Sequence, residues 1–347
     1  MLHSLIAPLK DRAALTQEQV RAAVVALVDE STSADLKADF LVALSQKGET
    51  ASEIAAFASH LRDLAIRPEL DRETASREIL DVCGTGGDKL NTFNISTTVA
   101  IVAASAEVTV AKHGNRAITS QAGSADVLDE LGIPTTFTPS QAAKSLSEVH
   151  FAFFFAPSYH PAFKHIGPCR KICAERGHRT IFNFLGPLLN PVRPRAQLLG
   201  VPRPELCLPL AEVLRELGSR RVMVVSGATP NGHLDELSIL GGSSIAEFYH
   251  DKGFHNSILD ARDFGIQPCS LEELRGGDRR ENARILTQIL AGEERGAKLS
   301  AVLLNSAAAL FIAGKVKSLT EGLEFSDELI RSGKALKKLD QLIRFRP

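Results

Sequence analysis

The chain has 347 residues, of which 44% are hydrophobic and 23% charged, and this ordinary globular composition favours one large domain or two unequal ones. A formal net charge of −1 argues against a protein that binds nucleic acid or a membrane surface, and no apolar run is long enough to cross a bilayer. Five scattered cysteines are typical of reduced thiols, and the amino terminus lacks the basic start and apolar core of a signal peptide, so we expect a cytoplasmic protein.

The first part of the chain has the pattern of a small all-helical domain, which we place at residues 1–74. Thr16 and Thr50 each begin a capping-box sequence, with Gln19 and Glu53 three residues later. Apolar residues follow both boxes at helical spacing, and a third helix is predicted between them.

From about residue 76, short β-prone runs alternate with helical ones. The predicted strands lie at 79–82, 108–111, 151–155, 198–201, 222–225 and 245–248, and the predicted helices at 124–131, 140–149, 204–217, 280–293 and 298–313. This alternation predicts an α/β domain with a central, mostly parallel sheet. A His-, Pro- and Lys/Arg-rich stretch at about 160–190 interrupts the pattern, and we expect it to pack back onto the helical domain. The α/β domain would then consist of residues 75–159 and 191–347.

A glycine-rich segment at residues 81–88, followed by Asn94-Ile95-Ser96-Thr97, is the first candidate site. A predicted strand precedes the glycines and a predicted helix begins at Ser96. A strand, a glycine-rich loop and a helix amino terminus together form an anion site from backbone N–H groups. The segment matches neither common nucleotide-loop pattern, and a glycine turn without a ligand is the alternative interpretation.

Three further clusters carry charge. Lys112-His113-Gly114-Asn115-Arg116 follows a predicted strand, where cations neutralise phosphates and an amide orients a polar substrate; the alternative is a solvated basic turn. Asp235-Glu236 suits a hard cation such as Mg²⁺, with an exposed acidic turn as the alternative. The guanidinium of Arg170 is suited to a carboxylate, or lies on the surface without a ligand. We assign His160 and His165 to packing or to the surface.

Taken in order along the chain, these motifs, together with Arg179-Thr180-Ile181-Phe182-Asn183-Phe184-Leu185-Gly186-Pro187-Leu188-Leu189-Asn190-Pro191, closely resemble the anthranilate phosphoribosyltransferases of tryptophan biosynthesis. The resemblance covers essentially the whole chain. It implies an active site at the hinge between the helical and α/β domains, and a homodimer formed through the helical domains. It also implies transfer of a phosphoribosyl group from phosphoribosyl pyrophosphate (PRPP) to the amine of anthranilate, with Mg²⁺, two ions in all.

The resemblance further implies roles for individual residues. The residues around PRPP would be Gly84, Gly87, Asp88, Thr92, Asn94, Ile95, Ser96, Thr97, Lys112, His113, Gly114, Asn115, Arg116, Ala117, Ile118, Thr119, Ser120 and Ser124. Anthranilate would contact Gly84, Asn115 and Arg170, with Arg170 at its carboxylate. Ser96 would ligate one Mg²⁺, and Asp235 and Glu236 the other.

The chemistry of this reaction needs charge and positioning more than proton transfer. Pyrophosphate leaves the ribose C1 carbon, so negative charge grows on the leaving group, and Lys112 and Asn115 would supply charge and positioning. We therefore expect no acid–base residue. Three alternatives stay open: a paralogue of the same fold with another acceptor, a pyrimidine nucleoside phosphorylase-like enzyme, and a non-catalytic sensor of a phosphate ligand.

Overall fold

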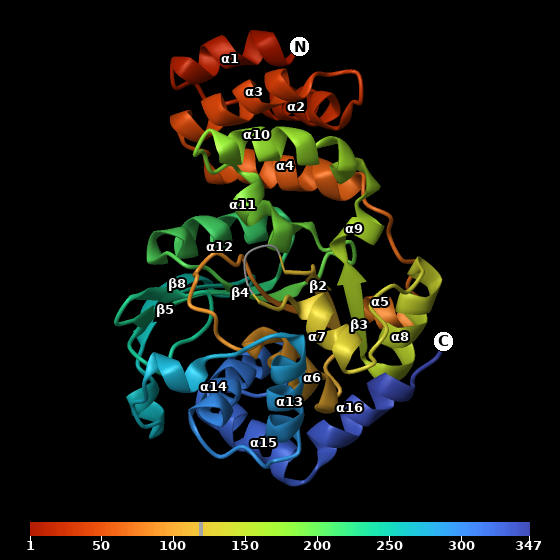
Figure 1. Ribbon diagram of the computed structural model, residues 1–347, viewed down its shortest axis with the longest axis vertical. Helices are drawn as coiled ribbons and strands as arrows, with labels where there is room; N and C mark the ends of the chain where they lie inside the picture. The colour runs from red at the N-terminus through yellow and green to blue at the C-terminus, as the bar shows by residue number, and fades with distance from the viewer. Residues whose placement is uncertain (118–120) are drawn as a thin grey trace.

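The computed structural model describes residues 1–117 and 121–347, and Figure 1 shows a helical part stacked on a larger α/β part. The helices of the amino-terminal part are α1 (Leu2–Lys10), α2 (Gln17–Val28), α3 (Ala34–Lys47) and α4 (Ala51–Asp63). Both predicted capping boxes are present, with Thr16 and Thr50 accepting from the backbone N–H groups of Gln19 and Glu53. The helical prediction for this part is thereby confirmed.

Residues 156–189 return from the α/β part to the helical part. They form α9 (Ala156–Tyr159), α10 (Gly167–Glu175), α11 (Phe182–Leu185) and the 3₁₀ helices η1 (Pro161–His165) and η2 (Gly186–Leu189). Lys37 of α3 donates to the carbonyl of His165 over 3.1 Å, and Arg176 after α10 pairs with Asp39 at 2.6 Å. In Figure 1, α10 accordingly lies beside α3 and α4.

The sheet has eight strands in the order β3-β2-β1-β4-β5-β7-β8, with β6 paired to β5. The strands are β1 (Leu80–Gly84), β2 (Val110–Gly114), β3 (Phe151–Phe155), β4 (Ala196–Gly200), β5 (Arg221–Thr229), β6 (Gly232–Leu234), β7 (Ser243–Tyr249) and β8 (Gly253–Leu259). Strands β1 to β5 run parallel, and β6, β7 and β8 add antiparallel pairings. The prediction of a mostly parallel sheet is confirmed.

Helices lie between the strands along the chain of the α/β part, and further helices follow the last strand. They are α5 (Arg72–Ser76), α6 (Ile95–Ser105), α7 (Ser124–Glu130), α8 (Pro139–Val149), α12 (Cys207–Glu216), α13 (Arg279–Leu290), α14 (Ala297–Ile312), α15 (Leu319–Arg331) and α16 (Lys334–Arg344), with the 3₁₀ helices η3 (Pro204–Leu206), η4 (Ala261–Phe264) and η5 (Leu271–Leu274). Strands β6 and β8 and helices α15 and α16 were not predicted. Strand β8 is half-exposed and polar at many positions, so its sequence lacks the apolar alternation of a buried strand.

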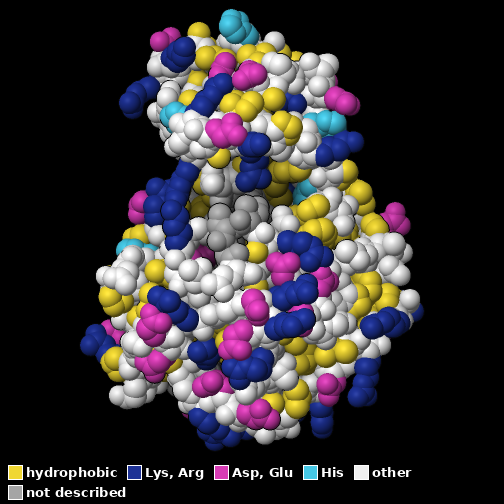
Figure 2. Space-filling model, in the orientation of Figure 1, with side chains coloured by type: hydrophobic (Ala, Val, Ile, Leu, Met, Phe, Trp, Pro, Cys, Tyr) yellow, Lys and Arg dark blue, Asp and Glu magenta, His cyan; other side chains and the backbone are white. Residues whose placement is uncertain are grey.

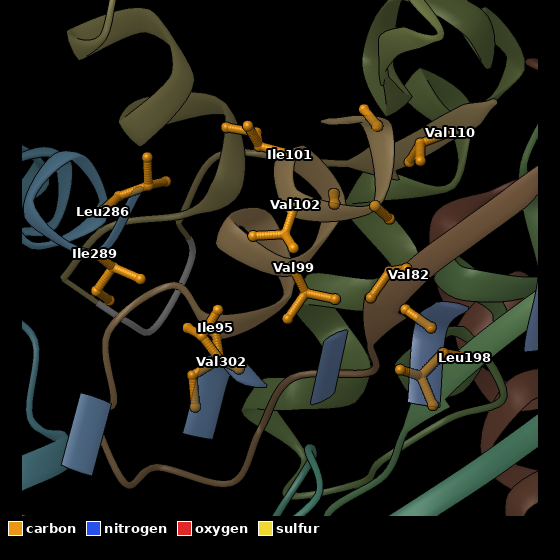
Figure 3. Close-up of a cluster of buried hydrophobic side chains, with 14 of the residues drawn as sticks. Val82, Ile95, Val99, Ile101, Val102, Val110, Leu198, Leu286, Ile289 and Val302 are labelled. Atoms are coloured by element: carbon orange, nitrogen blue, oxygen red, sulfur yellow. The ribbon is translucent and has the colours of Figure 1, made fainter. Parts of the chain in front are cut away.

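The two most apolar helices, α6 and α14, lie inside the α/β part. Figure 3 shows Val99 of α6 beside Val82 of β1, and Ile95 of α6 beside Val302 of α14, in one cluster of buried side chains. Burial in this core explains their apolar sequences. Of the helices in the described residues, none is both long and apolar enough to pass through a membrane.

Candidate active site

The glycine-rich loop leaves β1 at Gly84 and reaches α6 at Ile95, as predicted. Gly86 and Gly87 have φ of +73° and +87°, a left-handed backbone that other residues adopt with strain. A Cβ at Gly84 would overlap the carboxylate of Asp235. The loop therefore needs glycine for its own turn and for the approach of another segment.

That segment is the acidic pair Asp235-Glu236, which follows β6. Asp235 Oδ2 accepts from the backbone N–H of Gly86 at 2.7 Å, and Glu236 Oε1 accepts from the N–H of Ser96 at 3.1 Å. Both residues are half-buried. The alternative of an exposed acidic turn is wrong, because the pair lies against the loop and the amino terminus of α6.

Burial raises the pKa of both carboxyl groups. The neighbouring charge of Asp88 raises that of Asp235 further, and Asp235 raises that of Glu236. Asp88 Oδ1 also accepts from the N–H of Leu90 at 3.2 Å, so this carboxylate closes the loop and adds charge to the acidic pair. Three carboxylates thus meet where the loop and the acidic segment touch.

The cation of this cluster is Lys112, which is buried in the middle of β2. Its Nζ donates to the carbonyl of Val82 at 2.6 Å and to Ser96 Oγ at 3.3 Å. Burial lowers the pKa of Lys112, and the charges of Asp81 and Glu236 oppose that effect. An ammonium group has three N–H donors, and the described residues accept two of them, so one is left for a bound anion.

A fully buried carboxylate that the sequence analysis gave no role, Asp81, supports the end of β2. Its Oδ1 accepts from the N–H of His113 at 3.3 Å, and its Oδ2 accepts from Asn190 Nδ2 at 3.0 Å. Asn190 Nδ2 also donates to the carbonyl of Ala111 at 2.7 Å. Burial raises the pKa of Asp81 to about 6. An aspartate inside an apolar strand was the sequence signal for this role.

The oxygen donors at this position fit Mg²⁺. Asp235, Glu236 and Ser96 offer hard carboxylate and hydroxyl oxygens around two acids whose charges are unfavourable without a cation. Among the described residues, no group of three or more His, Cys, Asp or Glu side chains could hold a metal alone. The protein would therefore supply part of the coordination, and substrate phosphates and water the rest.

The segment after Lys112 is tied to α7. Arg116 pairs with Asp126 at 3.1 Å and Asp129 at 2.6 Å, and the N–H of Ala117 donates to Asp126 at 2.9 Å. Asn115 is exposed, and Ser124 Oγ donates to its carbonyl at 3.4 Å. The predicted contacts Ile118, Thr119 and Ser120 lie outside the described residues. The charge of Arg116 is thus already balanced by two carboxylates.

The remaining predicted PRPP contacts surround the start of α6. Thr92 forms an isolated antiparallel bridge with Arg275, and Asn94 Nδ2 donates to the carbonyl of Ala122 at 3.3 Å. The side chain of Ile95 is buried in the core, which leaves only its backbone for a ligand. Thr97 is buried, and its hydroxyl has no partner among the described residues.

A row of rings joins the end of β2 to Arg170. The rings of His113 and His160 are 5.4 Å apart between centroids, and His160 lies at the same distance from Phe163. Phe163 contacts Phe182 edge to face at 5.8 Å, and the exposed Arg170 guanidinium lies 5.7 Å from the Phe182 ring centre. An apolar row that ends in a cation suits an aromatic carboxylate.

Sequence reasoning missed the aromatic members of this row and treated His160 as packing. Burial lowers the pKa of His113 to about 3 and that of His160 to about 4, so both rings are neutral. No described residue satisfies either ring nitrogen of His160, or Nε2 of His113. Buried, unpaired nitrogens are unusual in a merely structural histidine. The signal in the sequence was the cluster of aromatic and basic residues at 160–182.

The loop, the acidic pair and the Lys112 ammonium lie near the carboxyl ends of β1 and β2, and the ring row leads from there to the helical part. Figure 2 shows the surface hollowed between the helical part and the α/β part. Ligand sites of open parallel sheets occupy this edge. The glycine-rich loop with the acidic pair and the row of rings therefore share one interdomain position.

Comparison with known proteins agrees with this architecture. Residues 76–336 match the model described as "Glycosyl transferase family, a/b domain", and residues 3–65 match its helical bundle domain. An anthranilate phosphoribosyltransferase of Petrotoga mobilis is 43% identical over 331 residues, which are 95% of this chain and 93% of the relative.

Solved structures give the same result. The anthranilate phosphoribosyltransferase of Thermus thermophilus superposes with a TM-score of 0.87 at 39% identity, covering 97% of this chain and 98% of that one. The Saccharomyces cerevisiae enzyme in complex with PRPP and Mg has a TM-score of 0.86 at 29% identity, with 99% and 96% covered. By sequence and by structure along nearly its whole length, the chain belongs to the anthranilate phosphoribosyltransferase family.

Proposed function

We propose that this chain transfers the 5-phosphoribosyl group of PRPP to the amine of anthranilate and releases pyrophosphate, with Mg²⁺, as a step of tryptophan biosynthesis. The observation that carries the proposal is the junction of the glycine-rich loop, Ser96 and Lys112 with the acidic pair. Backbone N–H groups at a helix start and a buried ammonium attract an anion, and the acidic pair would hold the Mg²⁺ that neutralises a polyanion. The family relationship supports the same reaction.

The PRPP end would use the free N–H of Lys112, the loop backbone and the start of α6. Asp235 and Glu236 would hold one Mg²⁺ and Ser96 the other, and bound Mg²⁺ supplies positive charge to the pyrophosphate oxygens. Since Asp235 accepts from the N–H of Gly86, this carboxylate must move aside before that donor can bind phosphate. Lys112 would stabilise the charge that grows on departing pyrophosphate.

The anthranilate end would use the ring row, with Arg170 at the carboxylate and Asn115 beside the amine. The low pKa values of His113 and His160 keep both imidazoles neutral above about pH 5, so neither adds a positive charge near the oxocarbenium-like ribose. Positioning of the amine, rather than its deprotonation by a strong base, would supply the rate enhancement.

The test is anthranilate fluorescence followed in the presence of PRPP and Mg²⁺. We expect consumption that needs all three components. If anthranilate is not consumed and binds no better than benzoate, the reaction is wrong and only the fold remains. Pyrimidine nucleosides with phosphate serve as the alternative substrates. A pH series at saturating Mg²⁺ and PRPP checks for a base, since one essential group titrating near neutrality would contradict the mechanism.

Assembly and location are proposals of the same kind. A homodimer through the helical part is what the family resemblance implies, and three exposed apolar residues, Val25 of α2 and Leu64 and Ile66 after α4, lie on that part. Light scattering after size exclusion would measure the mass, and a monomer would contradict the dimer. Cytoplasmic location is supported by five free cysteines, which a fractionation of cells expressing the chain would check.

A further inference from the structure

The acidic segment lies across the ends of three neighbouring strands, each of which has a glycine at the point of contact. Gly84 ends β1, Gly200 ends β4 in register with it, and Gly227 lies in β5. A Cβ at Gly200 would overlap the carbonyl of Asp235, and one at Gly227 would lie 2.5 Å from the carbonyl of Glu236. The three glycines form a trough that fits this backbone and excludes a side chain.

The other side of the segment is held by Asn305 of α14, which is fully buried. Its Oδ1 accepts from the N–H of Leu237 at 2.9 Å, and its Nδ2 donates to the carbonyl of Leu237 at 3.0 Å. Nδ2 also donates to the carbonyl of Ala301 at 2.9 Å, which fixes the amide on its own helix. The Asn305 side chain therefore satisfies both the N–H and the carbonyl of Leu237, as a neighbouring strand would in a β-sheet.

We propose that Asn305 and Gly200 are positioning residues, which together set where the carboxylates of Asp235 and Glu236 stand and thereby set the affinity of the site for its divalent cation. The inference rests on the proposed role of Asp235 and Glu236. Neither carboxylate has a rigid element of its own, because β6 ends at Leu234 and the residues after it are irregular. Groups that orient metal ligands are worth one to two orders of magnitude in affinity.

The experiment measures Mn²⁺ binding to the full chain by the loss of the free-ion EPR signal, with PRPP present and anthranilate absent, after subtraction of the loss that PRPP causes without protein. Asn305→Ala frees Leu237, and Gly200→Ala pushes against the backbone of Asp235. We expect each to weaken Mn²⁺ binding about tenfold or more. In turnover, the PRPP KM should rise at low Mg²⁺ and recover at high Mg²⁺, with the anthranilate KM unchanged.

Two matched controls separate positioning from general loss of stability. Ser306→Ala changes the next residue of α14, whose buried hydroxyl has no partner among the described residues. Gly322→Ala places a Cβ 2.8 Å from Ala307 Cα at the contact between α14 and α15, without touching the acidic segment. Both should bind Mn²⁺ as the unchanged protein does, and Gly322→Ala should lower the thermal midpoint.

The outcomes distinguish the inference from the proposed function on which it rests. If Asp235→Asn weakens Mn²⁺ binding while Asn305→Ala and Gly200→Ala do not, the positioning role is overturned and the proposed function stands. If Asp235→Asn also leaves binding unchanged, the metal assignment itself fails. Weakening by Gly322→Ala to the same degree would also overturn the inference. Should one of the two test variants not fold, the other decides.

Discussion

At the scale of single residues, the site is built from groups whose burial changes their chemistry. Two of the three N–H donors of Lys112 have acceptors. The buried carboxylate of Asp81 accepts from three groups. Arg170 differs from both, because its guanidinium is exposed above a ring. These environments predict different consequences for mutation.

Arg170→Ala should raise the anthranilate KM about tenfold or more, because a charge-assisted hydrogen bond to a carboxylate contributes about 1.5–3 kcal/mol. The PRPP KM should stay nearly unchanged, since the ring row separates Arg170 from Lys112. Steady-state kinetics with each substrate varied in turn measures both constants. Arg176→Ala is the control, because Arg176 follows the same helix and pairs with Asp39. A main effect on the PRPP KM would show that Arg170 is misassigned.

Asp81→Asn should change how stability depends on pH. Burial raises the pKa of Asp81 in the folded state to about 6 from an ordinary 3.8, so the folded protein holds this proton more tightly than the unfolded chain. The proton bound to Asp81 therefore adds to the free energy of unfolding at low pH. This contribution is about 3 kcal/mol in full, and it is lost as the pH rises through 6. The stability of Asp81→Asn relative to the unchanged protein should therefore improve between pH 4 and 7.

Urea unfolding of both proteins across this range measures the difference. The absolute stability of the variant at one pH is less informative, because an amide cannot accept from both His113 and Asn190 as the carboxylate does. A constant difference between the two proteins from pH 4 to pH 7 would contradict the raised pKa.

At the scale of elements, local signals and tertiary contacts reinforce each other at the start of α4. Thr50 caps the helix, and Glu53 returns to the N–H of Thr50 at 2.9 Å. Glu53 also accepts from the N–H of Leu15 at 2.9 Å and pairs with the buried Lys47 at 2.6 Å. Glu53 therefore binds the helix start, the backbone of Leu15 and the Lys47 ammonium at once.

Thr50→Ala should lower the free energy of unfolding by about 1 kcal/mol, the usual cost of a lost amino-terminal cap. Chemical denaturation measures the loss. Thr50→Ser retains the hydroxyl and should recover most of it, while kcat should be unchanged in both variants. Equal stability of Thr50→Ala and the unchanged protein would show that Glu53 alone maintains the helix start.

At the scale of the whole molecule, hydrogen bonds of the buried Arg62 join the helical part to the α/β part. Arg62 of α4 is 3% exposed, and it donates to the carbonyl of Leu188 in η2 and, at 3.4 Å, to that of Leu217 after α12. Burial lowers the pKa of Arg62 to about 10. This side chain connects the helical part with residues 156–189 and with the end of α12 in the α/β part.

Arg62→Met keeps the apolar stem but removes these donors, which leaves the two carbonyls without their partner. We expect a loss of about 1–3 kcal/mol for each unsatisfied group, measured by chemical denaturation. Arg62→Lys is the conservative comparison and should lose less, since an ammonium can still reach one carbonyl. A variant as stable as the unchanged protein would mean that the carbonyls find other partners.

Features that depend on local chemistry could be predicted from the sequence. Capping boxes predicted the helices after Thr16 and Thr50, apolar runs predicted the parallel strands, and Gly84, Gly86 and Gly87 predicted a glycine-rich loop between a strand and a helix. These succeed because helix caps, strand burial and positive φ each demand particular residue types over a few positions. The ordered motifs also indicated the family.

Which distant residues meet depends on the tertiary structure. Gly86 and Asp235 are 149 residues apart, Asn190 and Asp81 109, and Asn305 and Leu237 68. The pairing of each depends on which strands are neighbours and on where the backbone leaves room, as at Gly200. A buried Asp, Asn or Gly looks the same in sequence whether it is a packing residue or a support for a site, because its partners are chosen by the topology and not by its neighbours in the chain.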